Sequence, residues 1–85
     1  MITVFGLWHL GCVTAACCAQ HYKTIGLDLD EDRIQQLSEG RAPLLEPGLD
    51  PLLQEGLGSG NLRFSCNPKE ALRDTRVLWV TLDTP

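Results

Sequence analysis

The sequence lacks the features that would point to nucleic acid, a membrane or secretion. Its seven lysines and arginines are scattered from Lys23 to Arg76 without forming a run, and the net charge is −4. We therefore expect no nucleic-acid partner. The longest apolar stretch near the start, residues 11–19, is too short to cross a bilayer, and the N-terminus shows neither a basic flank nor a cleavage site. These absences predict a cytoplasmic protein with no membrane partner.

Cysteines at the spacing of metal or redox sites are also missing. None of the four cysteines belongs to a CxxC pair; Cys12, Cys17 and Cys18 crowd into one expected helix, and Cys66 stands alone. We therefore expect neither structural disulfides nor a metal site. The favoured interpretation is that these residues are small buried hydrophobes in a reducing compartment.

What is present is an alternation of strand and helix patterns. The chain of 85 residues is 44% hydrophobic and 21% charged, which is typical of one globular domain. Short apolar runs rich in β-branched residues predict strands at 2–5, 23–28, 62–65 and 76–82. Helices are predicted at 10–20, between the N-cap Asp30 and the stop Gly40, from Leu49 to a stop within 56–60, and at 68–74.

Strands that alternate with helices predict a parallel sheet with right-handed crossovers, covered on both faces. The fold class is therefore α/β, a Rossmann-type doubly wound sheet. Such a sheet normally has about six strands, whereas this pattern gives about four. We expect residues 1–85 to be the N-terminal part of a larger domain, in which residues 77–82 form an open apolar edge.

The turn after the first strand carries the most informative motif. Gly6-Leu7-Trp8-His9-Leu10-Gly11 lies between a strand and a helix, and Asp28 closes the second strand 22 residues after Gly6. This is the frame of a dinucleotide fingerprint, in which glycines permit the tight turn and the close helix, and the acid binds the adenosine ribose. Trp8 replaces the middle glycine. Either its indole points away and binding is retained, which we favour, or the ring fills the cofactor site.

Asp28 also indicates which dinucleotide binds, because a carboxylate there suits the 2′-hydroxyl of NAD and repels the 2′-phosphate of NADP. We therefore predict NAD. Arg33, five residues on, could approach the same ribose or be a solvated helix residue. His9 could donate to a phosphate, although a histidine in a turn beside a tryptophan is more often a surface or packing residue. Cys12 lies in the first turn of a helix and has no convincing base partner, so a structural role is expected.

Several segments together resemble the NAD-binding domain of the UDP-glucose/GDP-mannose dehydrogenase family. They are ITVFGLWHLGCVTAACCA, GLDLDEDRI, LLEPGLDPLLQEGL with LRFS, and VLWVTLDTP. The EPGL segment before a leucine-rich helix is the most discriminating of them. The resemblance implies that Leu10, Gly11, Asp28, Arg33 and Thr84 contact NAD. With the turn residues, the cofactor-binding candidates are Gly6, His9, Leu10, Gly11, Asp28, Arg33 and Thr84.

The same resemblance implies an activity for the complete enzyme. Family members oxidise the C6 alcohol of a nucleotide sugar to a uronate, with two hydride transfers to NAD through a thioester on a cysteine in the second half of the protein. No cysteine here matches that nucleophile, so we assign no catalytic residue and expect the 85 residues alone to be inactive. The resemblance also implies polysaccharide biosynthesis and a homo-oligomer formed through other regions.

Three positions depart from the family pattern, and two alternative functions remain open. The departures are Trp8 in place of glycine, His9 in place of a common tyrosine, and Asp83, which adds a negative charge before Thr84. If Trp8 closes the site, the chain would be a non-enzymatic domain for assembly or regulation. A methyltransferase would also place an acid after the second strand, but it leaves the EPGL segment unexplained.

Overall fold

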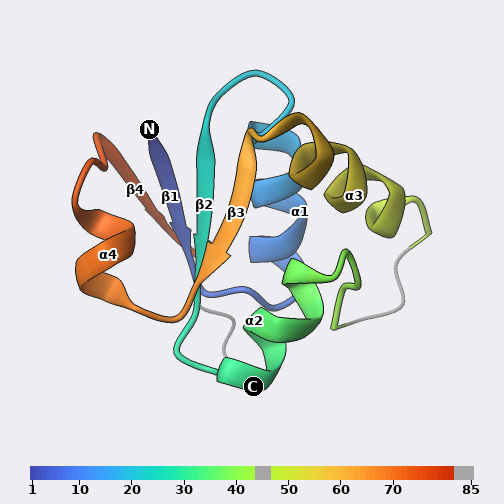
Figure 1. Ribbon diagram of the computed structural model, residues 1–85, viewed down its shortest axis with the longest axis horizontal. Coiled ribbons are helices and arrows are strands. Elements are labelled where there is room, and N and C mark those ends of the chain that lie inside the picture. Colours follow the sequence, from blue (N-terminus) through green and yellow to red (C-terminus); the bar gives the residue numbers. More distant parts are fainter. Residues whose placement is uncertain (44–46, 82–85) are drawn as a thin grey trace.

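The computed structural model describes residues 1–43 and 47–81. These residues form four strands and four helices in the order β1-α1-β2-α2-α3-β3-α4-β4 (Figure 1). The strands are β1 (Ile2–Phe5), β2 (Thr24–Leu27), β3 (Leu62–Ser65) and β4 (Val77–Val80), and the helices are α1 (His9–Cys18), α2 (Glu31–Ser38), α3 (Leu49–Ser59) and α4 (Pro68–Leu72).

The strands form one parallel sheet in the order β3-β2-β1-β4. In this register Val4 of β1 lies beside Gly26 of β2 on one side and beside Trp79 of β4 on the other. Helices α1, α2 and α3 lie on one face of the sheet and α4 lies on the other (Figure 1). The predicted Rossmann-type α/β fold is confirmed.

The main core lies between the sheet and the three helices on the first face. Fully buried side chains there include Val4, Leu7, Leu37 and Leu53, which come from four different segments. A smaller cluster on the second face joins Ile25 and Leu27 of β2 to α4. Helix α1 packs on β1 and so holds the turn that follows β1, and α3 packs in turn on α1.

Local signals set most of the helix limits. The side chain of Asp30 accepts a hydrogen bond from the amide of Arg33 at 3.1 Å and caps α2, as predicted. Gly40 follows the end of α2 with a φ of 84°, a conformation that glycine adopts without steric cost. Helix α1 spans residues 9–18 rather than 10–20, and β4 covers 77–80 of the predicted 76–82. Residue 82 lies outside the described residues.

The cysteines are all free, but they are not all interior. Cys12 is buried on the sheet-facing side of α1, whereas Cys17 is exposed and Cys18 and Cys66 are partly exposed. The prediction of buried thiols is therefore wrong for Cys17, because the last turn of α1 has a face that meets no other element. Within residues 1–43 and 47–81, no helix is long and apolar enough to span a membrane.

Candidate dinucleotide site

The turn between β1 and α1 depends on its first and last glycines. Gly6 has a φ of 98°, which side chains rarely tolerate. A Cβ atom at Gly11 would overlap the carbonyl oxygen of Gly6 and lie 2.6 Å from Oγ1 of Thr81. Both residues therefore have the structural roles that the fingerprint predicts: a tight turn, and close contact between helix and strand.

The middle position of the fingerprint accommodates a tryptophan. Trp8 has a φ of −101°, so its backbone does not require glycine. Its ring packs on Arg33, whose guanidinium carbon lies 4.6 Å from the ring centroid. The ring therefore faces the side chain from α2 that also contacts Asp28.

Asp28 joins the turn after β1 to the start of α2. Its Oδ2 accepts a hydrogen bond from the amide of Leu7 at 2.8 Å, and its Oδ1 accepts one from the amide of Asp30 at 2.9 Å. Arg33 Nη1 donates to Oδ2 at 3.2 Å. Burial has the largest effect on the pKa of Asp28 and by itself would raise it, but the two amides and Arg33 together outweigh burial and hold the pKa below its ordinary value.

The remaining candidates lie near this carboxylate or outside the described residues. His9 and Leu10 form the first turn of α1, and both are exposed; Leu10 is 52% exposed. Trp8 precedes them as the N-cap residue and makes no side-chain cap hydrogen bond. Thr84 is not among the described residues, and neither is Glu46 of the EPGL segment.

Sequence reasoning missed Thr81, the residue that follows β4. Its hydroxyl donates to the carbonyl oxygens of Gly6 and Phe5, at 2.6 and 3.2 Å respectively, and the residue is 4% exposed. The hydroxyl thus ties the end of β4 to the turn. A single threonine at the end of an apolar strand gives no pattern that predicts such a contact across 75 residues of chain.

The arrangement fits a dinucleotide at the carboxyl ends of β1 and β2. An ionised carboxylate has about four lone-pair positions, and three donors occupy those of Asp28 in this structure, so one remains for a ribose hydroxyl. The glycine turn brings the start of α1 to the same edge of the sheet, where a helix N-terminus favours a pyrophosphate.

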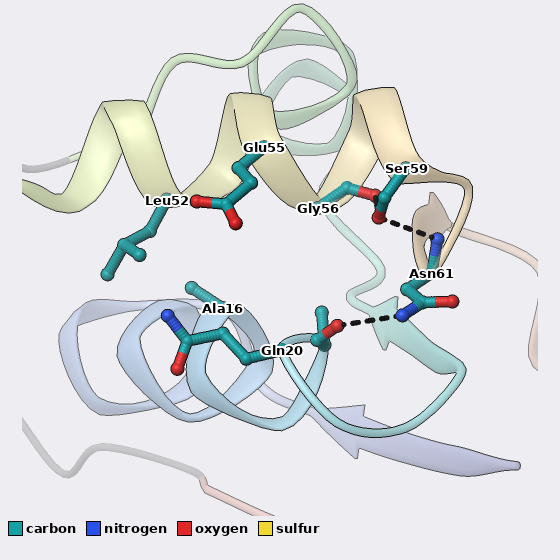
Figure 2. A pocket seen from close by; sticks show the side chains of 8 residues that line it. Ala16, Gln20, Leu52, Glu55, Gly56, Ser59 and Asn61 are labelled. Carbon is teal, nitrogen blue, oxygen red and sulfur yellow. Dashed lines mark hydrogen bonds between the residues drawn. The ribbon is translucent and has the colours of Figure 1, made fainter.

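A separate cavity of ≈110 Å³ lies between α1 and α3 (Figure 2). Leu52 and Glu55 of α3 face Ala16 of α1 and Gln20 just beyond the end of α1 across it, and Asn61 borders it beyond the end of α3. The Asn61 side chain donates to the carbonyl oxygen of Ala19 at 3.1 Å. A cavity of this volume is below the roughly 300 Å³ of the smaller ligand pockets, and it does not involve the fingerprint turn or α2. It is therefore no candidate for the dinucleotide.

Fold and turn thus define a dinucleotide-binding α/β domain. The family model for the UDP-glucose/GDP-mannose dehydrogenase family, NAD binding domain, matches residues 1–85. This chain belongs to that family, and its cofactor is NAD. The match favours the dehydrogenase hypothesis over both the non-enzymatic domain and the methyltransferase.

Individual relatives agree with the family assignment. GDP-mannose 6-dehydrogenase of Pseudomonas putida is 38% identical over 85 residues, which cover 99% of this chain and 19% of that protein. UDP-N-acetyl-D-mannosamine dehydrogenase of Methanococcus aeolicus is 42% identical over 71 residues, which cover 82% of this chain and 16% of that protein. The chain therefore spans about a fifth of the length of the relatives it matches.

The solved structures extend the agreement to the fold. A ternary complex of GDP-mannose dehydrogenase from Pseudomonas aeruginosa superposes with a TM-score of 0.94 at 35% identity, over 99% of this chain and 20% of that one. UDP-glucose dehydrogenase of Pyrobaculum islandicum gives 0.92 at 32% identity, again over 99% and 20%.

Proposed function

We propose that these 85 residues supply the first part of the NAD-binding domain of a longer nucleotide-sugar 6-dehydrogenase. The enzyme would oxidise the C6 alcohol of a UDP- or GDP-sugar to the uronate, with two hydride transfers to NAD. The observation that carries this proposal is the Asp28 carboxylate, held at the end of β2 beside the glycine turn, in a chain that matches the family along its whole length.

Each candidate residue has a proposed role toward the cofactor. Gly6 and Gly11 shape the turn, and His9 and Leu10 present the first turn of α1 to the pyrophosphate. Asp28 accepts a hydrogen bond from a hydroxyl of the adenosine ribose, and Arg33 lies beside that ribose. Thr84 enters the set through the family resemblance alone. Bound NAD supplies the hydride acceptor, while the chain's own residues bind and orient it.

The charge at Asp28 supports the choice of NAD. Its low pKa keeps the carboxylate ionised at neutral pH, so it accepts a hydrogen bond from a 2′-hydroxyl and repels a 2′-phosphate. Because Leu7 and Asp30 hold both carboxylate oxygens, the group is already oriented before the cofactor binds. This pre-organisation reduces the entropy that binding loses.

The substrate class follows from the relatives. Their names specify GDP-mannose, UDP-N-acetyl-D-mannosamine and UDP-glucose, so the shared feature is a sugar on a nucleoside diphosphate.

We assign no catalytic residue within the chain. We further propose a role in polysaccharide biosynthesis and a homo-oligomeric enzyme assembled through other regions. A cytoplasmic location is supported by the four free cysteines, which suit a reducing compartment.

The test is a dehydrogenase assay on the complete protein that carries this chain. NAD is supplied with GDP-mannose, UDP-glucose or UDP-N-acetylmannosamine, and both NADH and the sugar product are measured. We expect two NADH per uronate with one of these substrates. A protein that neither binds NAD nor oxidises any of these nucleotide sugars would instead support the non-enzymatic alternative, in which Trp8 closes the cofactor site.

A further inference from the structure

Trp8 contributes a side chain at a position where the fingerprint has none. Its φ of −101° shows that the backbone needs no glycine there, and the residue is 38% exposed. The ring contacts the guanidinium of Arg33, whose central carbon lies 4.6 Å from the ring centroid. At this distance a cation attracts the face of an indole.

Arg33 is held in place by three groups, one from the turn after β1 and two from the connection between β2 and α2. Besides the ring, its Nη1 lies 3.2 Å from Oδ2 of Asp28 and its Nη2 lies 3.9 Å from Oδ2 of Asp30. The arginine belongs to the first turns of α2, where the helix dipole disfavours a cation. The position of the guanidinium beside Asp28 therefore depends on its contacts with groups outside α2. Among these groups the Trp8 indole alone is uncharged.

The position of Arg33 determines what a nucleotide meets at the ribose. A guanidinium engaged with Asp28 leaves the carboxylate a position for a 2′-hydroxyl. A guanidinium released from Asp28 could instead pair with a 2′-phosphate, as an arginine does in NADP-binding domains. Selection between NAD and NADP thus depends on the position of Arg33 as well as on the charge of Asp28.

We propose that Trp8 is a positioning residue for cofactor selection: its indole holds Arg33 on Asp28 and so keeps the guanidinium away from a 2′-phosphate. The inference rests on the NAD-binding role proposed above. It gives a function to the residue that departs most clearly from the fingerprint.

The test compares Trp8→Leu, which removes the aromatic face, with Trp8→Phe, which retains one. NAD and NADP are each titrated by calorimetry into the complete protein, and the readout is the ratio of the NADP Kd to the NAD Kd. In Trp8→Leu we expect the ratio to fall about fivefold, the equivalent of one exposed cation–π contact. In Trp8→Phe it should stay within about twofold of the native value. The matched control is Trp79→Leu, which replaces a half-exposed tryptophan on β4 and should leave the ratio unchanged.

Equal changes in both affinities would overturn the inference, since they would show that Trp8 acts only through its bulk. A native protein that binds neither nucleotide would instead refute the proposed function. A second measurement needs no cofactor: the indole ring current should shift the Arg33 side-chain proton resonances upfield in the native protein and not in Trp8→Leu. Ordinary Arg33 shifts in the native protein would overturn the inference.

Discussion

The two outer strands of the sheet, β3 and β4, have the same length and direction but differ in what covers them. Leu62 and Ser65 of β3 are 3% and 6% exposed, and the strand contacts α2, α3 and α4. All four residues of β4 are exposed by about half, from 49% to 52%, although VLWV is more apolar than LRFS. The helices that pack on β3 therefore determine its burial more than its hydrophobicity does, since the more apolar β4 remains half exposed.

The largest loss of stability should come from a side chain added at Gly11, where α1 packs closely on the turn after β1. A Cβ there would overlap the Gly6 carbonyl oxygen, which belongs to the backbone and cannot rotate away. We expect Gly11→Ala to destabilise the protein by about 3 kcal/mol or more in urea denaturation. Gly58→Ala on α3, where a Cβ would meet nothing within 4 Å, is the matched control and should be stabilising by up to about 1 kcal/mol. Equal effects of the two substitutions would contradict this account.

A pair of valines compares the covered and uncovered strands directly. Val4 on β1 is fully buried, and Val80 on β4 is 52% exposed. We expect Val4→Ala to lower the free energy of unfolding by about 2 kcal/mol, and Val80→Ala to lower it by less than about 0.5 kcal/mol. Similar losses at both positions would show that β4 is as well packed as β1.

The Asp28 carboxylate should contribute to stability in a pH-dependent way. Asp28→Asn is expected to cost about 1–2 kcal/mol at pH 7, because hydrogen bonds to a charged group are lost. The folded-state pKa is depressed, so this stability is present above the unfolded pKa of about 3.9 and is lost as pH falls through the folded value. The native and Asn proteins should therefore approach each other in stability below about pH 4. Urea denaturation of both proteins at pH 7 and below about pH 4 checks this prediction. A difference in the free energy of unfolding between the two proteins that does not change with pH would contradict it.

The smallest effect on stability is expected at the exposed strand itself. Leu78→Lys should change the free energy of unfolding by less than about 0.5 kcal/mol, because Leu78 is 49% exposed. The added charge should nevertheless reduce self-association through the apolar edge strand, measured by sedimentation velocity of the 85-residue chain. An unchanged sedimentation profile would show that β4 does not mediate association.

The features that were predictable from the sequence are those with a local pattern. The apolar run 62–65 matches β3, and Asp30 caps α2 as its position before the helical pattern indicates. Gly6 and Gly11 occupy the strained and crowded positions that the fingerprint requires.

The features that were not predictable depend on contacts between distant segments. The hydrogen bond of Thr81 to Gly6 joins segments 75 residues apart, and no sequence pattern indicates it. The contact of the Trp8 ring with Arg33 depends on how α2 places that arginine against the turn, and no sequence pattern indicates it. Both contacts can be recognised only in the folded structure, where the packed sheet brings the two segments together.

The central claim is that NAD binds at the Asp28 end of β2, and calorimetric titration of NAD into the complete protein tests it most directly. The native protein should bind NAD more tightly than NADP, and Asp28→Asn should weaken NAD binding by about tenfold or more. Asp32→Asn, at an exposed position of α2, is the control and should bind as the native protein does. Failure of the native protein to bind NAD, or equal binding by native and Asp28→Asn proteins, would contradict the account.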